Sequence, residues 1–281
     1  MAIKKDKIIS IDQGTSSTRS VLYDEYGRLV DAVQEEFEQI FPYDGWVEHN
    51  PEEIWESVLS TLKALVKRNG LNSEEIASIG ITNQRETTVI WNKKTGRAIY
   101  NAIVWQDRRT SKFCEELASY EKLIHQKTGL MIDPYFSATK INWLLRNIEG
   151  ARAQAKNGDL LFGTIDSFLI WKMTEGRSHK TDITNASRTM LFNIEEERWD
   201  PQLLELFDVP PIILPEVCEN VSNFGSTNIL GGEVSIGGVA GDQQAALIGQ
   251  CCFNPGDVKS TYGTGCFMIV NTGEEAIYSE N

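Results

Sequence analysis

The stretch IISIDQGTSSTRSVLY, residues 8–23, decides the fold of this chain. Residues 8–11 and 20–23 are short apolar runs with the polar residues 12–19 between them, a pattern that predicts strand, loop and strand. After a turn, residues 29–37 continue as a third extended segment. Three successive strands without helices between them fit poorly with a parallel barrel, in which a helix follows every strand.

Helices and strands alternate along the rest of the chain. Asn50, Pro51 and Glu53 have the types and spacing of a helix N-terminus, and apolar residues at helical spacing continue to Gly70. Later strands are predicted at 76–82, 87–91, 159–163 and 234–240, and later helices from 137 and at 165–173 and 245–251. An antiparallel start followed by this alternation predicts an α/β fold with a mixed sheet flanked by helices.

Composition excludes several classes of protein. The chain has 281 residues, enough for about two domains, and 41% of them are hydrophobic, as in soluble globular proteins. Its 27 basic and 40 acidic side chains give a net charge of −13, which argues against non-specific binding to nucleic acid or anionic membranes. The sequence shows no signal peptide or membrane span, so no stable membrane insertion is expected. Five cysteines without a C-x-x-C pair favour a reducing compartment, and we expect a cytoplasmic protein.

The pattern of the opening hairpin returns near the end of the sequence. Residues 258–262 and 266–270 are predicted strands, joined by the small polar turn Gly263-Thr264-Gly265. A duplicated fold whose second copy is cut short would explain this, and so would an unrelated C-terminal hairpin. Spacing alone favours neither explanation.

The polar stretch 12–19 is the first candidate site. Gly14 allows a tight turn with exposed N–H groups, the hydroxyls of 15–18 add donors and Arg19 adds a positive charge, which together suit a polyphosphate. Asp12, at the end of the first strand, is placed to hold Mg²⁺ through water. A plain Ser/Thr-rich hairpin loop is equally compatible with these residues. Neither the P-loop nor the Rossmann glycine pattern occurs.

Other segments have side chains suited to a polyol. Arg85 and Glu86 would offer a donor and an acceptor to neighbouring hydroxyls, although adjacent charges at a strand end are more often a solvated pair. Trp105 and Tyr135 would add aromatic walls. Asp242 follows a predicted strand among small residues, where it could either face a ligand or cap the next helix.

Six motifs in a fixed order carry a resemblance to a known family. They are IDQGTSSTR (11–19), GITNQRETT (80–88), WQDRRT (105–110), DPYFSATK (133–140), GDQQAA (241–246) and TYGTGCF (261–267). Together they resemble the FGGY carbohydrate kinases, and among these the members that phosphorylate glycerol. The resemblance implies an actin-like ATPase (ribonuclease H-like) fold with two duplicated domains around a cleft. It also implies ATP-dependent phosphorylation of glycerol to glycerol 3-phosphate.

The same resemblance implies a role for each matching residue. Glycerol would contact Arg85, Glu86, Trp105, Tyr135, Asp242, Gln243 and Phe267. The nucleotide phosphates would face Gly14, Thr15, Ser16, Ser17, Arg19, Thr264 and Gly265. Asp242 would be the catalytic base, and Asp12 would hold Mg²⁺.

Members of the family are much longer, so the resemblance implies a truncated chain. Residues 1–254 would form the N-terminal domain and residues 255–281 the start of a second domain, without the adenosine contacts. Glycerol and ATP or ADP would be the ligands, and the full-length protein would be a homo-oligomer. A xylulose or gluconate kinase and a non-catalytic polyol-binding fragment are the alternatives. The pair Arg85-Glu86 with Trp105 favours the small triol over the sugars.

Overall fold

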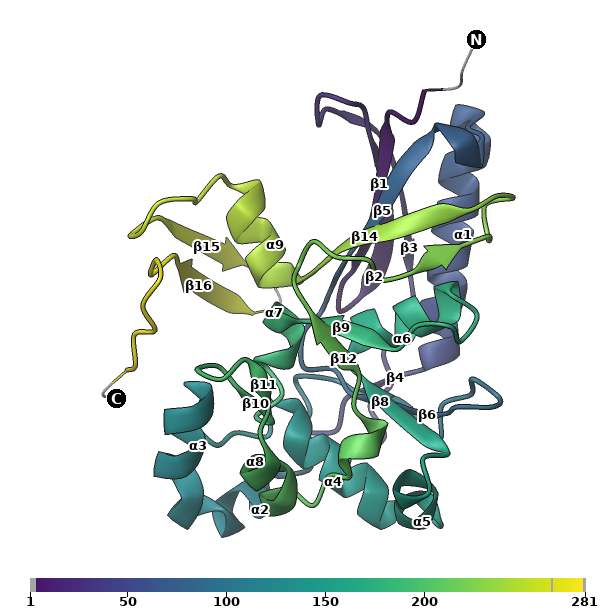
Figure 1. The fold of residues 1–281 in the computed structure, drawn as a ribbon. Coiled ribbons are helices and arrows are strands. Elements are labelled where there is room, and N and C mark those ends of the chain that lie inside the picture. The colour runs from purple at the N-terminus through teal and green to yellow at the C-terminus, as the bar shows by residue number, and fades with distance from the viewer. Residues whose placement is uncertain (1–3, 264, 280–281) are drawn as a thin grey trace.

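The computed structural model describes residues 4–263 and 265–279. A twisted sheet with a long helix beside it, a mainly helical region and a separate hairpin make up the ribbon (Figure 1). The strands are β1 Lys7–Gln13, β2 Ser17–Tyr23, β3 Leu29–Glu36, β4 Glu48–His49, β5 Ile76–Asn83, β6 Val89–Asn92, β7 Ala102–Ile103, β8 Leu160–Gly163, β9 Lys180–Asp182, β10 Phe192–Asn193, β11 Arg198–Trp199, β12 Glu216–Cys218, β13 Ser226–Thr227, β14 Val234–Gly241, β15 Val258–Tyr262 and β16 Cys266–Val270. The α-helices are α1 Pro51–Asn69, α2 Ser111–Glu116, α3 Glu121–Thr128, α4 Ser137–Asn147, α5 Ala151–Lys156, α6 Ile165–Met173, α7 Ile183–Ala186, α8 Pro201–Leu206 and α9 Asp242–Gly249.

The central sheet has six strands in the order β13-β14-β5-β1-β2-β3. β1, β2 and β3 form an antiparallel meander, whereas β5 runs parallel to β1 and β14 runs parallel to β5. The predicted mixed sheet with an antiparallel start is therefore confirmed. Because β5 and β14 are parallel neighbours, the segments that follow their carboxyl ends emerge at the same edge of the sheet.

The turn between β1 and β2 is tighter than the sequence predicts. β1 continues to Gln13 and β2 begins at Ser17, so the predicted loop at 12–19 shrinks to residues 14–16. Asp12 and Arg19 are cross-strand partners. The prediction of a longer loop was wrong because polar residues are tolerated in a strand when they face a groove or are hydrogen-bonded. Asp12 and Arg19 face the groove, whereas the buried Thr18 hydroxyl is hydrogen-bonded to that of Ser57.

The starts of α1 and α9 show where the local sequence predicts a helix boundary and where it does not. α1 begins as predicted: the Asn50 side chain accepts from the Glu52 N–H at 3.0 Å, and Gly70 ends the helix at φ 62°. By contrast, α9 begins at Asp242 rather than at Ala245. Its first turn, Asp-Gln-Gln, is polar because it borders a cavity, so hydrophobic periodicity does not reveal it.

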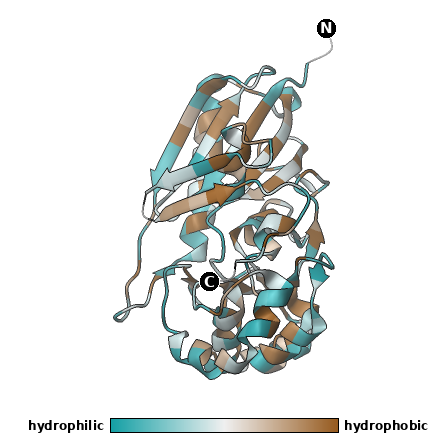
Figure 2. Cartoon of the chain, turned by 90° about the vertical axis from the view of Figure 1, so that its left-hand side faces the viewer, coloured by the Kyte–Doolittle hydropathy of each residue, from teal (hydrophilic) through white to brown (hydrophobic). Residues whose placement is uncertain are grey.

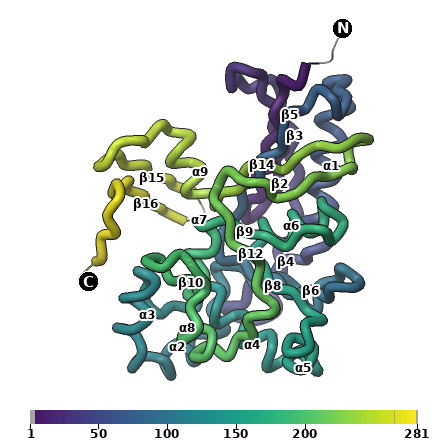
Figure 3. Tube along the Cα trace, viewed as in Figure 1, coloured from purple at the N-terminus to yellow at the C-terminus, as the bar shows by residue number. Residues whose placement is uncertain are grey.

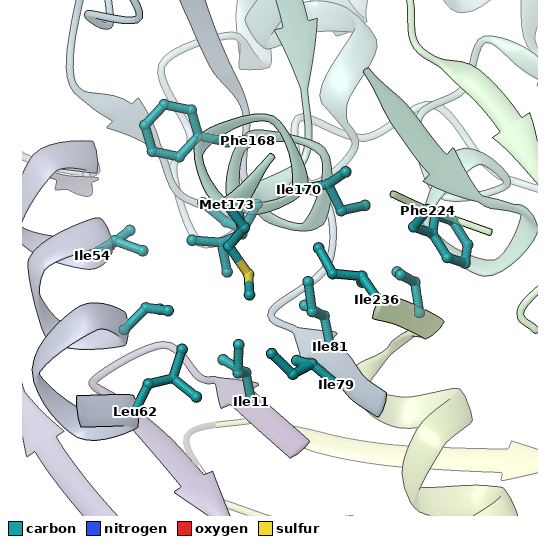
Figure 4. Close-up of a cluster of buried hydrophobic side chains, with 14 of the residues drawn as sticks. Ile11, Ile54, Leu62, Ile79, Ile81, Phe168, Ile170, Met173, Phe224 and Ile236 are labelled. Carbon is teal, nitrogen blue, oxygen red and sulfur yellow. The ribbon is translucent and has the colours of Figure 1, made fainter. Parts of the chain in front are cut away.

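The main hydrophobic core lies between the sheet, α1 and α6. On β1, Ile9 and Ile11 are fully buried in this core, whereas Ser10 and Asp12 lie along a groove on the other face. Apolar and polar segments alternate along the strands (Figure 2). Ten labelled side chains from the sheet, from α1 and α6 and from the segment before β13 meet in this core (Figure 4). Burial of each such side chain contributes roughly 1.5–3 kcal/mol to the free energy of unfolding. The core therefore holds β1, the strand that carries Asp12, in a fixed position.

The hairpin of β15 and β16 stands apart from the central sheet. Its strands pair with each other from Val258–Val270 to Tyr262–Cys266, as the sequence predicts. The hairpin packs beside α9 (Figure 3). Among the described helices, none has the length and the continuous apolar surface that crossing a membrane requires.

Asp166 in α6 and Asp182 at the end of β9 are both fully buried, and their charges interact as an acid pair. Asp182 accepts several hydrogen bonds from backbone and side-chain donors of α7. Asp166 accepts from the hydroxyls of Thr164 and Thr181, which can equally well accept from a protonated carboxyl. Burial raises the pKa of both carboxyls, and because the partners of Asp166 can accept as well as donate, we expect Asp166 to be the one that binds the proton. Burial, together with the charge of Asp182, raises the pKa of Asp166 to about 7.

Replacing Asp166 with Asn is expected to stabilise the protein at neutral and alkaline pH. The pKa of Asp166 is about 7 in the folded protein against an ordinary value of 3.8, so the folded state binds more protons between these values. The free energy of unfolding of the wild type therefore falls as the pH rises through this interval. Asp166→Asn removes that loss, and urea denaturation should show it more stable than the wild type by at least about 1 kcal/mol at pH 8, with little difference at pH 4.

Asp200→Asn is a control for which we expect the opposite dependence of stability on pH. Against the effect of burial, hydrogen bonds from Lys127 and Asn193 hold the pKa of Asp200 below its ordinary value. This stabilisation is present at high pH and is lost as the pH falls, so Asp200→Asn should cost more at pH 8 than at pH 4. A stability difference between Asp166→Asn and the wild type that is the same at both pH values would contradict the assignment of the proton.

Candidate active site

A small cavity of about 130 Å³ lies at the edge of the sheet where β5 and β14 end. Residues that follow these two strands line it, together with residues from the β1–β2 turn, the segments around Trp105 and Tyr135, and the tip of the β15–β16 hairpin. All seven side chains predicted for a polyol line this cavity: Arg85, Glu86, Trp105, Tyr135, Asp242, Gln243 and Phe267.

Arg85 and Glu86 form a constrained turn that begins two residues after the end of β5. Glu86 has φ 62°, a left-handed conformation that costs a non-glycine residue about 1 kcal/mol or more. Its carbonyl accepts hydrogen bonds from the hydroxyls of Thr88 at 3.0 Å and Ser137 at 2.9 Å, which hold the turn. Arg85 is 4% and Glu86 1% exposed, so the interpretation of the two as a solvated charge pair is wrong.

Charges of both signs converge on the cavity. The Nε atom of Arg85 lies 3.3 Å from Oδ1 of Asp242 and 4.0 Å from Oε1 of Glu86. A second guanidinium, that of Arg188, donates to the same Glu86 oxygen from Nε at 2.6 Å. Gly241 permits this approach, since a Cβ there would lie 2.6 Å from Cδ of Arg85. The two carboxylates are thus compensated by two guanidinium groups inside a largely buried site.

Asp242 is the first residue of α9, and Gly241 occupies the N-cap position before it. The interpretation of Asp242 as the N-cap of this helix is therefore wrong. Its Oδ1 accepts from the Gln243 N–H at 2.7 Å. Burial raises the pKa of Asp242 to about 6, with Arg85 opposing the shift and Glu86 adding to it. A carboxylate with this pKa can accept a proton near neutral pH.

Aromatic rings close the other side of the cavity. The ring of Trp105 lies 5.6 Å from that of Tyr135 and 5.8 Å from that of Phe267, both in edge-to-face geometry. The indole N–H of Trp105 donates to Oγ1 of Thr15 at 3.0 Å, which ties this wall to the β1–β2 turn. Burial raises the pKa of Tyr135 to about 12, so its hydroxyl keeps its proton and can donate to a ligand.

A larger groove of about 1240 Å³ follows the open face of the sheet. Asp12 and Arg19 line it and form an ion pair of 2.9 Å, while Asp242 and Gln243 line both the groove and the small cavity. Of the other residues predicted to face phosphate, Thr15 and Gly265 line the small cavity, and Gly14, Ser16 and Ser17 line neither space. Thr264 lies outside the described residues.

Three contributors to the site escape the sequence analysis. Arg188 has no motif of its own, and its partner Glu86 lies 102 residues away. Lys259 lies in a predicted strand without a motif, yet its Nζ donates to Oε1 of Gln243 at 2.9 Å. Thr261 opens the motif TYGTGCF and lines both spaces, but no role is predicted for it from the sequence. The sequence pattern of β15 points the other way, because the charged Lys259 is buried while its apolar neighbour Val258 is 52% exposed.

The sheet order and the cavity between its strand ends define the class of this protein. The chain belongs to the FGGY family of carbohydrate kinases, whose N-terminal domain matches residues 7–249. It is 57% identical to a glycerol kinase of Marinomonas sp. (strain MWYL1) over 278 residues, which are 98% of this chain and 56% of that relative. A glycerol kinase of Alteromonas mediterranea is likewise 57% identical over 280 residues, 98% of this chain and 56% of the relative.

A solved structure extends the similarity to three dimensions. The crystal structure of Plasmodium falciparum glycerol kinase with ADP superposes with a TM-score of 0.93 and 38% identity, over 99% of this chain and 56% of that one. The predicted actin-like ATPase fold and the predicted resemblance to glycerol kinases are thereby confirmed. The chain spans about half the length of these relatives.

Proposed function

We propose that the protein transfers the γ-phosphoryl group of ATP to a terminal hydroxyl of glycerol and releases glycerol 3-phosphate and ADP. The observation that carries this proposal is the small cavity itself, in which Glu86 can accept from hydroxyl groups while Arg85 and Tyr135 can donate to them. Aromatic rings face the remaining wall and suit the carbon edge of a polyol. The relatives named glycerol kinase support the same substrate.

The division of labour follows from where each side chain lies. Asp242 takes the proton from the attacking hydroxyl while the new oxygen–phosphorus bond forms and the bond from the γ-phosphorus to the ADP oxygen breaks. Asp242 is suited to this because it lines both the polyol cavity and the groove. Arg85, Glu86 and Gln243 hold the polyol, since phosphoryl transfer depends mainly on positioning and on charge stabilisation.

Mg²⁺ fits the groove through Asp12. Magnesium keeps much of its water and is held in kinases by one or two carboxylates and the substrate phosphates. The side chain of Asp12 is 34% exposed and lines the groove, whereas the described residues hold no cluster of three or more acidic, histidine or cysteine ligands. We therefore assign Asp12 to the hydration shell of an ion that would neutralise phosphate charge, with Arg19 beside it.

The same proposal covers domain organisation and compartment. We propose that residues 1–254 form the N-terminal domain and that residues 255–281 belong to a second one, because β15 and β16 pair with each other and not with the central sheet. Use of ATP and five unpaired cysteines, all of them among the described residues, support a cytoplasmic setting.

Calorimetric titration and a transfer assay test the substrate, using the protein at its full native length. Glycerol is expected to bind and to yield glycerol 3-phosphate when Mg²⁺ and ATP are present. Xylulose and gluconate are expected to bind far more weakly, because the cavity of about 130 Å³ is small. Preferential phosphorylation of either sugar would identify another FGGY kinase. Glycerol binding without any transfer would identify a non-catalytic polyol-binding protein.

A further inference from the structure

Among the described strands, none pairs with the outer edge of β14 at its carboxyl end, directly before the proposed base Asp242. β13 pairs with β14 at Val234 and Ser235, far from Gly241 at the other end of the strand. Beyond that pairing, the outer side of β14 is held by the segment around Asn220, whose carbonyl accepts from the Val239 N–H at 2.9 Å. An unpaired strand end next to a reacting group would leave that group free to shift.

One side chain satisfies the last amide of this edge. The Gly241 N–H donates to Oγ1 of Thr184 at 2.8 Å, and Gly241 is the residue directly before Asp242. The Thr184 hydroxyl in turn donates to Oδ2 of Asp182. Because a hydroxyl has one proton and that proton is committed to the carboxylate, the oxygen of Thr184 presents a lone pair to Gly241.

Asp182 connects this contact to the other strand of the site. Its Oδ1 accepts from Nδ2 of Asn185 at 2.7 Å, and Asn185 exchanges two side-chain hydrogen bonds of 3.0 Å with Asn83, the last residue of β5. Nδ2 of Asn220 donates both to Oδ2 of Asp182 at 2.8 Å and to the Val239 carbonyl at 3.0 Å. Asp182, Asn185 and Asn83 are fully buried. One buried carboxylate thus links the ends of β5 and β14, the two strands that precede Arg85 and Asp242.

We propose that Thr184, oriented by Asp182, is a positioning residue that fixes the strand end before Asp242 and so sets the proposed base against its hydroxyl substrate. This role rests on the proposed kinase activity. Thr184 does not line the polyol cavity, so it acts through Gly241 rather than on the ligand. A displacement of about 1 Å at a catalytic group can cost about 100-fold in rate, which sets the scale of the expected effect.

Two substitutions of Thr184 separate its hydroxyl from its bulk. Thr184→Val keeps the shape but removes the acceptor for Gly241, whereas Thr184→Ser keeps the hydroxyl. In the protein at full native length, Thr184→Val should lower kcat about 10- to 100-fold. Its KM for glycerol should change by less than about threefold, because Arg85 and Glu86 are held by other elements. Thr184→Ser should retain most of the wild-type kcat. Amide hydrogen exchange of Gly241 should quicken in Thr184→Val but not in Thr184→Ser.

Thr128→Val is the matched control. Oγ1 of Thr128 also accepts from a backbone amide, that of Leu130 at 3.1 Å, but at the end of α3 and outside the site. Thr128→Val should lose about as much stability as Thr184→Val but keep the wild-type kcat. If Thr184→Val does not fold, Asn220→Ser removes the neighbouring bonds to Asp182 and Val239, and the same fall in kcat is expected.

The outcomes distinguish the two levels of the proposal. An active wild type whose kcat is unchanged in Thr184→Val, or reduced equally in Thr128→Val, overturns the positioning role and leaves the kinase function standing. A wild type that transfers no phosphoryl group to glycerol overturns the function and with it the role. In that case the exchange rate of the Gly241 amide still reports whether the contact to Thr184 exists.

Discussion

Asp242→Asn is expected to keep the fold and to lower kcat by about 10²–10⁴ in the protein at full native length. A primary alcohol is a poor nucleophile until a base removes its proton, and an amide cannot accept that proton. Glycerol binding should weaken far less than kcat, since asparagine still forms hydrogen bonds with a hydroxyl. In the wild type, kcat should fall as the pH drops through about 6, because burial raises the pKa of Asp242 to this value and only the ionised carboxylate can act as a base. Steady-state kinetics at several pH values measures both effects.

Glu86→Gln is the matched control for this assignment. Glu86 is the second carboxyl of the cavity and is far more buried than Asp242. It is engaged by Arg188 at 2.6 Å and lies 4.0 Å from Arg85, which commits it to binding. Glu86→Gln should therefore raise KM for glycerol more than it lowers kcat. If Asp242→Asn retains a near-normal kcat while Glu86→Gln abolishes activity, the two roles must be exchanged.

Much of the fold is predictable because its signals are local. Alternating Ile9 and Ile11, the cap at Asn50 and the glycine at position 70 each act within a few residues, and the structure confirms the strand and helix that they predict. The prediction of where α9 starts fails for a related reason. Its first turn faces a cavity rather than the core, so the hydrophobic periodicity that marks other helices is missing there.

The site is less accessible to such reasoning because its contacts are long-range. Motifs single out Arg85 and Asp242, but not that an ion pair joins them across two strands. Arg188 lies within a segment without a distinctive pattern, and its importance rests on a partner 102 residues away. Thr184 is an ordinary threonine in the sequence, and the packing of α7 against β14 brings it beside Gly241. The sequence thus reveals which side chains have suitable chemistry, whereas the topology of the fold decides which of them come into contact.

Arg85→Met is expected to lower kcat/KM for glycerol by about 10²–10⁴, since hydrogen bonds to charged groups contribute about 1.5–3 kcal/mol each and Arg85 is placed to make more than one. Methionine can follow the buried stem of the arginine past Gly241 but has no donor. Because the guanidinium holds down the pKa of Asp242, its removal should also move the acid limb of the pH–rate profile above about pH 6. Kinetics with glycerol as the varied substrate, repeated from acid to alkaline pH, records both changes.

Two companion variants separate the charge of Arg85 from its shape. Arg85→Lys keeps a positive charge near Asp242, so the acid limb should stay close to pH 6 while kcat/KM still falls, because an ammonium group cannot reproduce the planar fork of a guanidinium. Arg188→Met removes the guanidinium that contacts Glu86 and not Asp242, so it should raise KM and leave the acid limb in place. Breaking a buried ion pair can cost about 3–5 kcal/mol of stability. Urea denaturation of each variant therefore measures this loss, so that it is not mistaken for an effect on catalysis. An acid limb that stays at pH 6 in Arg85→Met would show that Arg85 does not govern the ionisation of Asp242.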